Sequence, residues 1–99
     1  GVQTCALPIL FPVHAIAKNI HGIPVYRSLP EIRDHIHTIS VYVSKENSDK
    51  IADDILNMVP KRIIFNPGAE NYDLSGRAEK KGIEVVFGCT LVMLASGVF

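Results

Sequence analysis

Three polar segments in this sequence could bind an anionic ligand, because each follows an apolar run that predicts a β-strand. The segments are residues 17–19 (AKN), 43–47 (VSKEN) and 66–71 (NPGAEN). In an open parallel sheet, ligands bind outside the carboxyl ends of the strands. Helices that begin there offer free N–H groups and the positive end of a dipole, both of which favour an anion. The sequence therefore nominates this edge of the sheet as a phosphate-binding site.

Gly68 is the residue in these segments best suited to contact a phosphate through the main chain. A glycine lets a ligand approach the backbone closely, although the pair Pro67–Gly68 also suits a plain turn between a strand and a helix. Behind this turn, Glu70, Asn71 or Asp73 could cap the following helix. The corner thus has two interpretations, a phosphate contact or a simple connection.

Two lysines and one cysteine carry the remaining candidate chemistry. Lys18 and Lys45 could pair with phosphate or with an adenine edge, or could simply face water as isolated surface lysines. Cys89 precedes a predicted helix, a setting that can activate a thiol, but no histidine base is placed beside it by the sequence. His35 and His37 lack a third ligand at metal spacing, so we expect structural or surface roles for the histidines.

The composition limits what the partners of this protein can be. Ten basic and ten acidic residues cancel, which leaves no electrostatic footprint for nucleic acid or for an anionic membrane. No apolar stretch reaches the roughly 18 residues of a membrane span. Two cysteines cannot form a disulfide framework, so we expect a reducing, cytoplasmic environment.

The order of predicted elements indicates an α/β protein. Apolar runs predict five strands, at residues 12–17, 21–26, 38–43, 62–66 and 83–87. The strand at 21–26 contains Pro24 and therefore belongs at an edge, whereas the strand at 38–43 is apolar on both faces and is typical of a central strand. Helix-length segments separate the later strands. We therefore predict a mostly parallel sheet covered by helices on both faces.

Four helices are expected between and after the strands. They cover residues 28–36, about 48–59, 72–82 and 90–97. The second has apolar residues at helical spacing, which predicts that this stripe packs on the sheet: Ile51, Ile55, Met58 and Val59. Asn47 or Ser48 is expected to cap that helix, and Thr90 to cap the last one. Gly82 and Gly97 are expected to end the last two helices in a left-handed conformation.

The runs PVHAIA, HGIPVY, TISVYV, PKRIIFNPGAEN and KKGIEVVFGCTLVMLASG, in this order, resemble the small bacterial CoA-binding domain proteins. These are Rossmann-like single domains similar to the nucleotide-binding part of the succinyl-CoA synthetase α subunit. The resemblance implies that CoA, or a related adenine nucleotide, lies across the carboxyl edge of the sheet. It further implies that the following residues line the cleft: Lys18, Val43, Ser44, Lys45, Asn66, Pro67 and Gly68.

The beginning of the chain departs from that family pattern. The family starts with a strand, a glycine-containing phosphate turn and a helix, and no glycine-rich turn stands before Pro12. Residues 1–9 instead look like a translated sequencing adapter. We therefore expect residues 1–10 to be a non-native segment and residues 11–99 to be a CoA-binding domain that lacks its first βα unit. Such a loss should weaken CoA binding by several orders of magnitude.

Three functions remain open at the level of the sequence. The first is a CoA-binding module that has no catalytic group of its own. The second is an enzyme of acyl-CoA chemistry that uses Cys89. The third is an interaction domain that forms a homodimer through its apolar C-terminal segment, residues 89–99, and whose nucleotide binding is vestigial.

Overall fold

The computed structural model of the chain describes residues 19–20, 23–24, 29–33 and 35–99. These residues fall into two units that divide after Arg33, and each unit is treated by itself. The first unit contains strands β1 (Asn19–Ile20) and β2 (Ile23–Pro24), which pair antiparallel, and the 3-10 helix η2 (Leu29–Glu31). The predicted strand at 12–17 lies outside the described residues. Strand β2 lies within the strand predicted at residues 21–26. The sequence did not predict that it pairs with β1.

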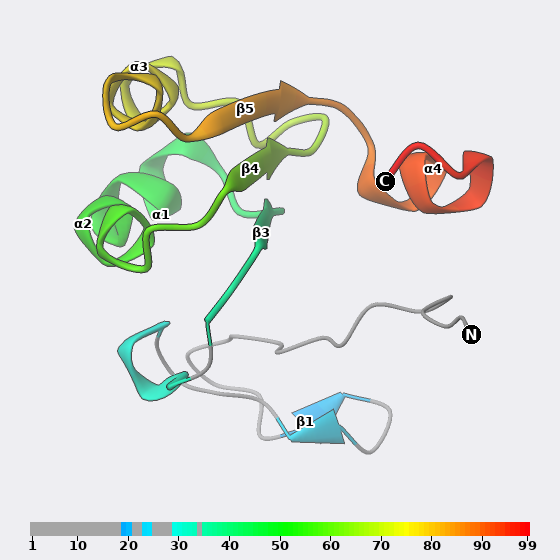
Figure 1. The fold of residues 1–99 in the computed structure, drawn as a ribbon, viewed down its shortest axis with the longest axis horizontal. Coiled ribbons are helices and arrows are strands. Elements are labelled where there is room, and N and C mark those ends of the chain that lie inside the picture. Colours follow the sequence, from blue (N-terminus) through cyan, green and yellow to red (C-terminus); the bar gives the residue numbers. More distant parts are fainter. Residues whose placement is uncertain (1–18, 21–22, 25–28, 34) are drawn as a thin grey trace. The chain divides into compact units, whose positions relative to one another are not determined.

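The second unit holds a parallel sheet of three strands, β3 (Thr38–Val41), β4 (Arg62–Phe65) and β5 (Glu84–Phe87), in the order β3-β4-β5. Thr38 pairs with Arg62, and Arg62 pairs with Glu84, so the strands are aligned at their starts (Figure 1). The predicted parallel arrangement of these three segments is confirmed. Their carboxyl ends consequently lie at one edge of the sheet.

The middle strand, β4, provides the centre of the core. The side chains of Ile63, Ile64 and Phe65 are completely buried, and β4 has a strand on each side. The expectation that the strand at 38–43 is central is not tested in full, because the predicted strand at 12–17 lies outside the described residues. In the sheet that the structure describes, β3 has one neighbour, its first three residues are half-buried, and Tyr42 is exposed.

The connection from β3 to β4 contains two short helices instead of one. Helix α1 spans Lys45–Lys50, α2 spans Ala52–Asn57, and Ile51 between them leaves helical geometry with φ −117° and ψ 14°. Ser44, rather than Asn47 or Ser48, caps α1, so the helical region begins earlier than predicted.

The buried stripe of this connection includes Ile55, as predicted, but otherwise differs from the predicted one. Its buried members are Ser48, Ala52, Ile55 and Leu56, whereas Ile51 and Val59 are exposed. Both sets have the spacing i, i+4, i+7, i+8, so periodicity alone does not choose between them. The face that packs on the core is the one that carries the small residues Ser48 and Ala52, which allow close packing.

Helix α3 (Tyr72–Lys80) connects β4 to β5, and α4 (Thr90–Ser96) follows β5. Figure 1 shows α1, α2 and α3 together on one side of the strands and α4 apart from them. Gly82 and Gly97 have φ of +81° and +77°, which confirms the two predicted left-handed helix ends. Among the described residues, no helix is both long and apolar enough to cross a membrane.

Candidate functional site

The segments that follow the three parallel strands meet at the carboxyl edge of the sheet. After β3 come residues 42–44, after β4 comes the corner of residues 66–71, and after β5 come residues 88–89. The corner connects β4 to α3 and contains the turn in which Gly68 adopts φ +89°. Two of the three segments nominated from the sequence, 43–47 and 66–71, are therefore brought to one edge, and residues 88–89 join them. Residues 17–18 of the third segment lie outside the described residues.

Asn66 is the centre of a buried network at this edge, which we call the Asn66 cluster: Ser40, Val41, Asn66 and Thr90. Its Nδ2 donates to the Ser40 hydroxyl and to the Val41 carbonyl, both at 2.9 Å. Its Oδ1 accepts from the Thr90 N–H at 2.8 Å. The hydroxyls of Ser40 and Thr90 also bond to each other, at 2.7 Å. One side chain therefore ties the ends of two strands to the start of α4.

The role expected of Thr90 is corrected by this network. Thr90 is the first residue of α4 and is buried, and the residue at the capping position is Cys89, whose side chain makes no capping hydrogen bond. The Asn66 side chain accepts from the α4 backbone instead. A cap supplied by another strand leaves no local pattern in the sequence, which is why the local signal at Thr90 was misleading.

Gly68 presents its backbone at the exposed middle of the corner. No heavy atom lies within 4 Å of the place where a Cβ would stand, so the space beside the main chain is open. The Gly68 N–H donates to both carboxylate oxygens of Glu70, at 3.1 and 3.2 Å. The backbone donor nominated for phosphate is thus held by a carboxylate of the same corner.

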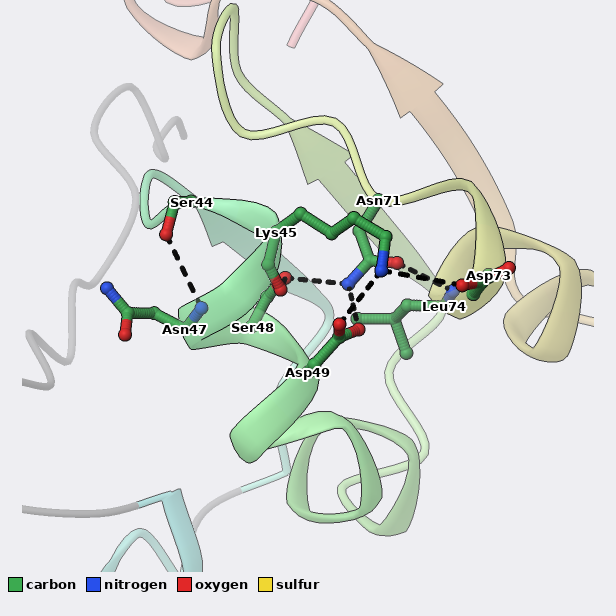
Figure 2. Close-up of polar contacts among 8 residues, drawn as sticks. All are labelled: Ser44, Lys45, Asn47, Ser48, Asp49, Asn71, Asp73 and Leu74. Carbon is green, nitrogen blue, oxygen red and sulfur yellow. Dashed lines mark hydrogen bonds and ion pairs between the residues drawn. The ribbon is translucent and has the colours of Figure 1, made fainter.

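Asn71 closes the corner and caps α3, as one of the three caps considered. Its Oδ1 accepts from the Leu74 N–H at 3.0 Å, and the side chain is fully buried. Its Nδ2 donates to the Ser48 hydroxyl and to Asp49 Oδ1, both at 2.8 Å (Figure 2). We call Lys45, Ser48, Asp49 and Asn71 the Asn71 cluster. It joins α1 to the start of α3.

Lys45 lies on the outer side of the Asn71 cluster. Its ammonium group pairs with Asp49 at 2.9 Å and with Asp73 at 3.4 Å, as Figure 2 shows. The hydrogen bond to Asp49 raises the pKa of Lys45, and Asp73 adds to the effect. The hydrogen bond from Lys45, followed by that from Asn71, lowers the pKa of Asp49. Half of the Lys45 side chain stays exposed, so the charge is paired but accessible.

The structure brings most of the residues nominated from the sequence to the same edge. Exposed or partly exposed there are Val43, Ser44, Lys45, Pro67 and Gly68, whereas Lys18 lies outside the described residues. The Ser44 hydroxyl accepts from the Asn47 N–H at 3.4 Å and thereby caps α1. Asn66 is 3% exposed and its side-chain amide is fully engaged, so its geometry is that of a positioning residue.

Sequence reasoning missed several residues of the edge. The partners of the two asparagines were not nominated: Ser40, Ser48 and Asp49. Lys45 and Asp49 are four residues apart, a spacing that places opposite charges together on a helix, and this signal was available. The hydroxyl partners are separated from their asparagines by more than twenty residues, and no local pattern connects them.

Cys89 is partly exposed where α4 begins. No hydrogen bond joins its thiol to His35 or His37, the two histidines within the described part of the chain. In the same part, no group of three or more histidine, cysteine, aspartate or glutamate side chains has an arrangement that could hold a metal ion.

Comparisons with known proteins agree with this architecture. The family model described as a CoA binding domain matches residues 8–95. The crystal structure of an uncharacterized protein is 38% identical, with a TM-score of 0.83 over 90% of this chain and 73% of that one. A conserved hypothetical protein from Pyrococcus furiosus is 25% identical, with a TM-score of 0.72 over 87% of this chain and 72% of that one.

A hypothetical protein from Pyrococcus horikoshii OT3 has the same fold at 18% identity, with a TM-score of 0.78 over 89% of this chain and 62% of that one. A search of the curated proteins returned no match. The family model covers most of the sequence. Within the resemblance, the run RIIFNPGAEN forms β4 and the corner described above. The chain therefore belongs to the CoA-binding domain family and has its Rossmann-like α/β fold.

Proposed function

We propose that this protein binds CoA, or a related adenine nucleotide, at the carboxyl edge of the sheet formed by β3, β4 and β5. The observation that carries the proposal is the corner at residues 66–71. It sets an exposed glycine with φ +89° and open space beside its backbone at the edge of a CoA-binding domain. Backbone N–H groups in such turns are well suited to an anion.

The groups at the edge fit the chemistry of a phosphorylated ligand. Gly68 offers a backbone N–H, and Lys45 offers an exposed ammonium group. Val43, Ser44 and Pro67 are exposed beside them and would line the ligand. The phosphate groups of CoA supply the negative charge that these donors attract. The buried side chain of Asn66 holds the corner in position through its hydrogen bonds to β3 and α4.

In this proposal the protein is a binding module located in the cytoplasm. Among the described residues, the edge presents binding groups and no nucleophile paired to a base. The Cys89 thiol supports the second candidate, acyl transfer, since it is partly exposed at the same edge. Homodimerisation is the third candidate, and the exposed apolar side chains of Leu91, Val92 and Val98 favour it.

The test is a titration of the protein with CoA followed through its backbone amide resonances, because NMR also detects weak binding. We expect saturable shifts at Ser44, Lys45 and Gly68. Pantetheine, which lacks the nucleotide and its phosphates, should leave these resonances in place. Shifts that are confined to other residues, or no shifts at millimolar CoA, would remove the proposal.

A matched pair of variants sharpens the test. Gly68→Val should weaken CoA binding, because the side chain fills the space that a phosphate needs. Gly82→Val introduces a similar backbone strain at φ +81°, also in open space, but at the opposite end of α3. Its CoA affinity should stay within about twofold of the wild type, a margin of about 0.4 kcal/mol. Equal losses in both variants would mean that Gly68 acts through stability alone.

A further inference from the structure

We propose that Glu70 is an internal competitor for the phosphate of the ligand and that it sets the affinity of the edge. This inference rests on the proposed function, because it concerns how that same site accepts CoA. Its starting point is the hydrogen bond from the Gly68 N–H to both oxygens of the Glu70 carboxylate. The protein's own anion lies where the anion of the ligand is expected.

The contact between Glu70 and Gly68 is local and easily opened. The two residues are two positions apart, and both lie on the accessible side of the corner, where Gly68 is exposed and Glu70 partly exposed. Opening the contact moves only a side chain, because the ends of the corner are held by the buried amides of Asn66 and Asn71. The corner can therefore exchange one anion for another without a change of fold.

The competition at Gly68 is exclusive, whereas that at Lys45 is not. A backbone N–H has a single hydrogen, and the Glu70 carboxylate already occupies it. The ammonium group of Lys45 has three hydrogens and two carboxylate partners, Asp49 and Asp73, so it retains one for a ligand. Binding of a phosphate at Gly68 must therefore displace Glu70, while binding at Lys45 displaces nothing.

Charge repulsion makes displacement the only favourable route. A phosphate that contacts Gly68 while Glu70 stays in place would lie beside a carboxylate of the same sign, which opposes binding. Once Glu70 has turned away, the phosphate takes over a charge-assisted hydrogen bond of the same kind. Only a strong, multiply charged acceptor gains from this exchange. Glu70 thus favours a diphosphate-bearing ligand over weaker anions.

The experiment compares Glu70→Ala and Glu70→Gln with the wild type in the same NMR titration, using CoA, inorganic diphosphate and pantetheine as probes. We expect Glu70→Ala to bind CoA and diphosphate about tenfold more tightly and pantetheine no better. Glu70→Gln should gain less than Glu70→Ala, because it removes the negative charge but keeps an oxygen that accepts from the Gly68 N–H. In the unliganded Glu70→Ala variant, the Gly68 amide resonance should move away from its wild-type position. Glu70→Gln keeps an acceptor for the Gly68 N–H and guards against loss of the turn.

Glu79→Ala is the control for net charge, since it removes the same charge from an exposed position near the other end of α3. Its affinity for CoA should change less than twofold. If the wild type binds CoA at this edge and neither Glu70 variant binds more tightly than Glu79→Ala, the inference is wrong and the proposed function stands. If wild type and variants alike leave the edge resonances unmoved by CoA, both fall.

Discussion

The Asn66 cluster and the Asn71 cluster stand at the two ends of one corner, and they differ in the partners of their asparagines. Asn66 bonds to neutral groups of β3 and α4, and it is buried together with Val41 and Thr90, while Ser40 is half-buried. Asn71 is equally buried, but its amide reaches Asp49, which continues outward to the exposed Lys45. The Asn66 end of the corner is held by buried, neutral groups. The Asn71 end is linked through Asp49 to the solvent-exposed Lys45.

This difference shows how a small domain can be rigid and still accept a ligand. The neutral cluster has no charge that a ligand or a change of pH can alter, so it supplies a constant frame. The charged cluster ends in side chains that can change partners. Between them, Pro67 and Gly68 are exposed. Replacing each asparagine in turn measures the two ends separately.

Asn66→Ala should have the larger effect. It leaves the buried Thr90 N–H without an acceptor and removes two further hydrogen bonds, so we expect a loss of about 2–4 kcal/mol in the free energy of unfolding. Chemical denaturation checks the value. Asn57→Ala, at the exposed end of α2, is the control and should change stability by less than about 0.5 kcal/mol. If Asn66→Ala also lowered the free energy of unfolding by less than about 0.5 kcal/mol, the Asn66 cluster would not be what holds the corner in place.

Asn71→Ala should cost less, about 1–2 kcal/mol, because it removes the cap of α3 at the Leu74 N–H while its two side-chain partners keep other contacts. The Ser48 hydroxyl still donates to the Lys45 carbonyl, and Asp49 still pairs with Lys45. The same denaturation experiment applies, again against Asn57→Ala. A greater loss at Asn71 than at Asn66 would invert the comparison.

The smallest effect is expected from pH, and only the charged cluster should respond. The pKa of Asp49 is lowered in the folded state, so its contribution is present above the ordinary value of 3.8 and is lost as the pH falls through the folded pKa. The pKa of Lys45 is raised, so its contribution is complete below 10.5 and is lost as the pH rises through the folded pKa.

The check is the dependence of unfolding on pH in the wild type and in Asp49→Asn. The variant should lose less stability than the wild type between about pH 5 and pH 2, because it has no carboxylate to protonate at this position. Asp54→Asn is the control, since Asp54 pairs with no cation in the described structure. Identical acid profiles in wild type and Asp49→Asn would show that the cluster is insensitive to charge.

Much of the second unit could be predicted from the sequence, because its strands are short apolar runs between helix-length segments. Residues 62–65 form a buried middle strand, and both neighbours run parallel to it. The phase of the α1–α2 connection could not be predicted from apolar residues, since the buried face includes Ser48 and Ala52. A small residue on a packed face carries no hydropathy signal.

The candidate site was predicted in its location and less well in its contacts. Gly68 and Lys45 do lie at the carboxyl edge, because the parallel sheet brings the ends of its strands together. Their partners, Glu70 and Asp49, depend on side-chain rotamers and were not foreseen. The cap of α4 by Asn66 likewise depends on tertiary geometry. The cap of α1 by Ser44 depends on the exact residue at which the helix begins. The direct contact of Gly68 and Lys45 with a ligand stays a prediction.

The interruption at Ile51 separates two tasks within a single connection. The turn before it, α1, carries Lys45 and Asp49, which face the edge, and the segment after it, α2, carries Ile55 and Leu56, which fill the core. Because Ser48 is the one buried residue of α1, the other positions of α1 can be altered without disturbing the packing of α2 on the sheet. Over evolution, substitutions in α1 could therefore change what the edge recognises, while the packing that maintains the fold is inherited unchanged.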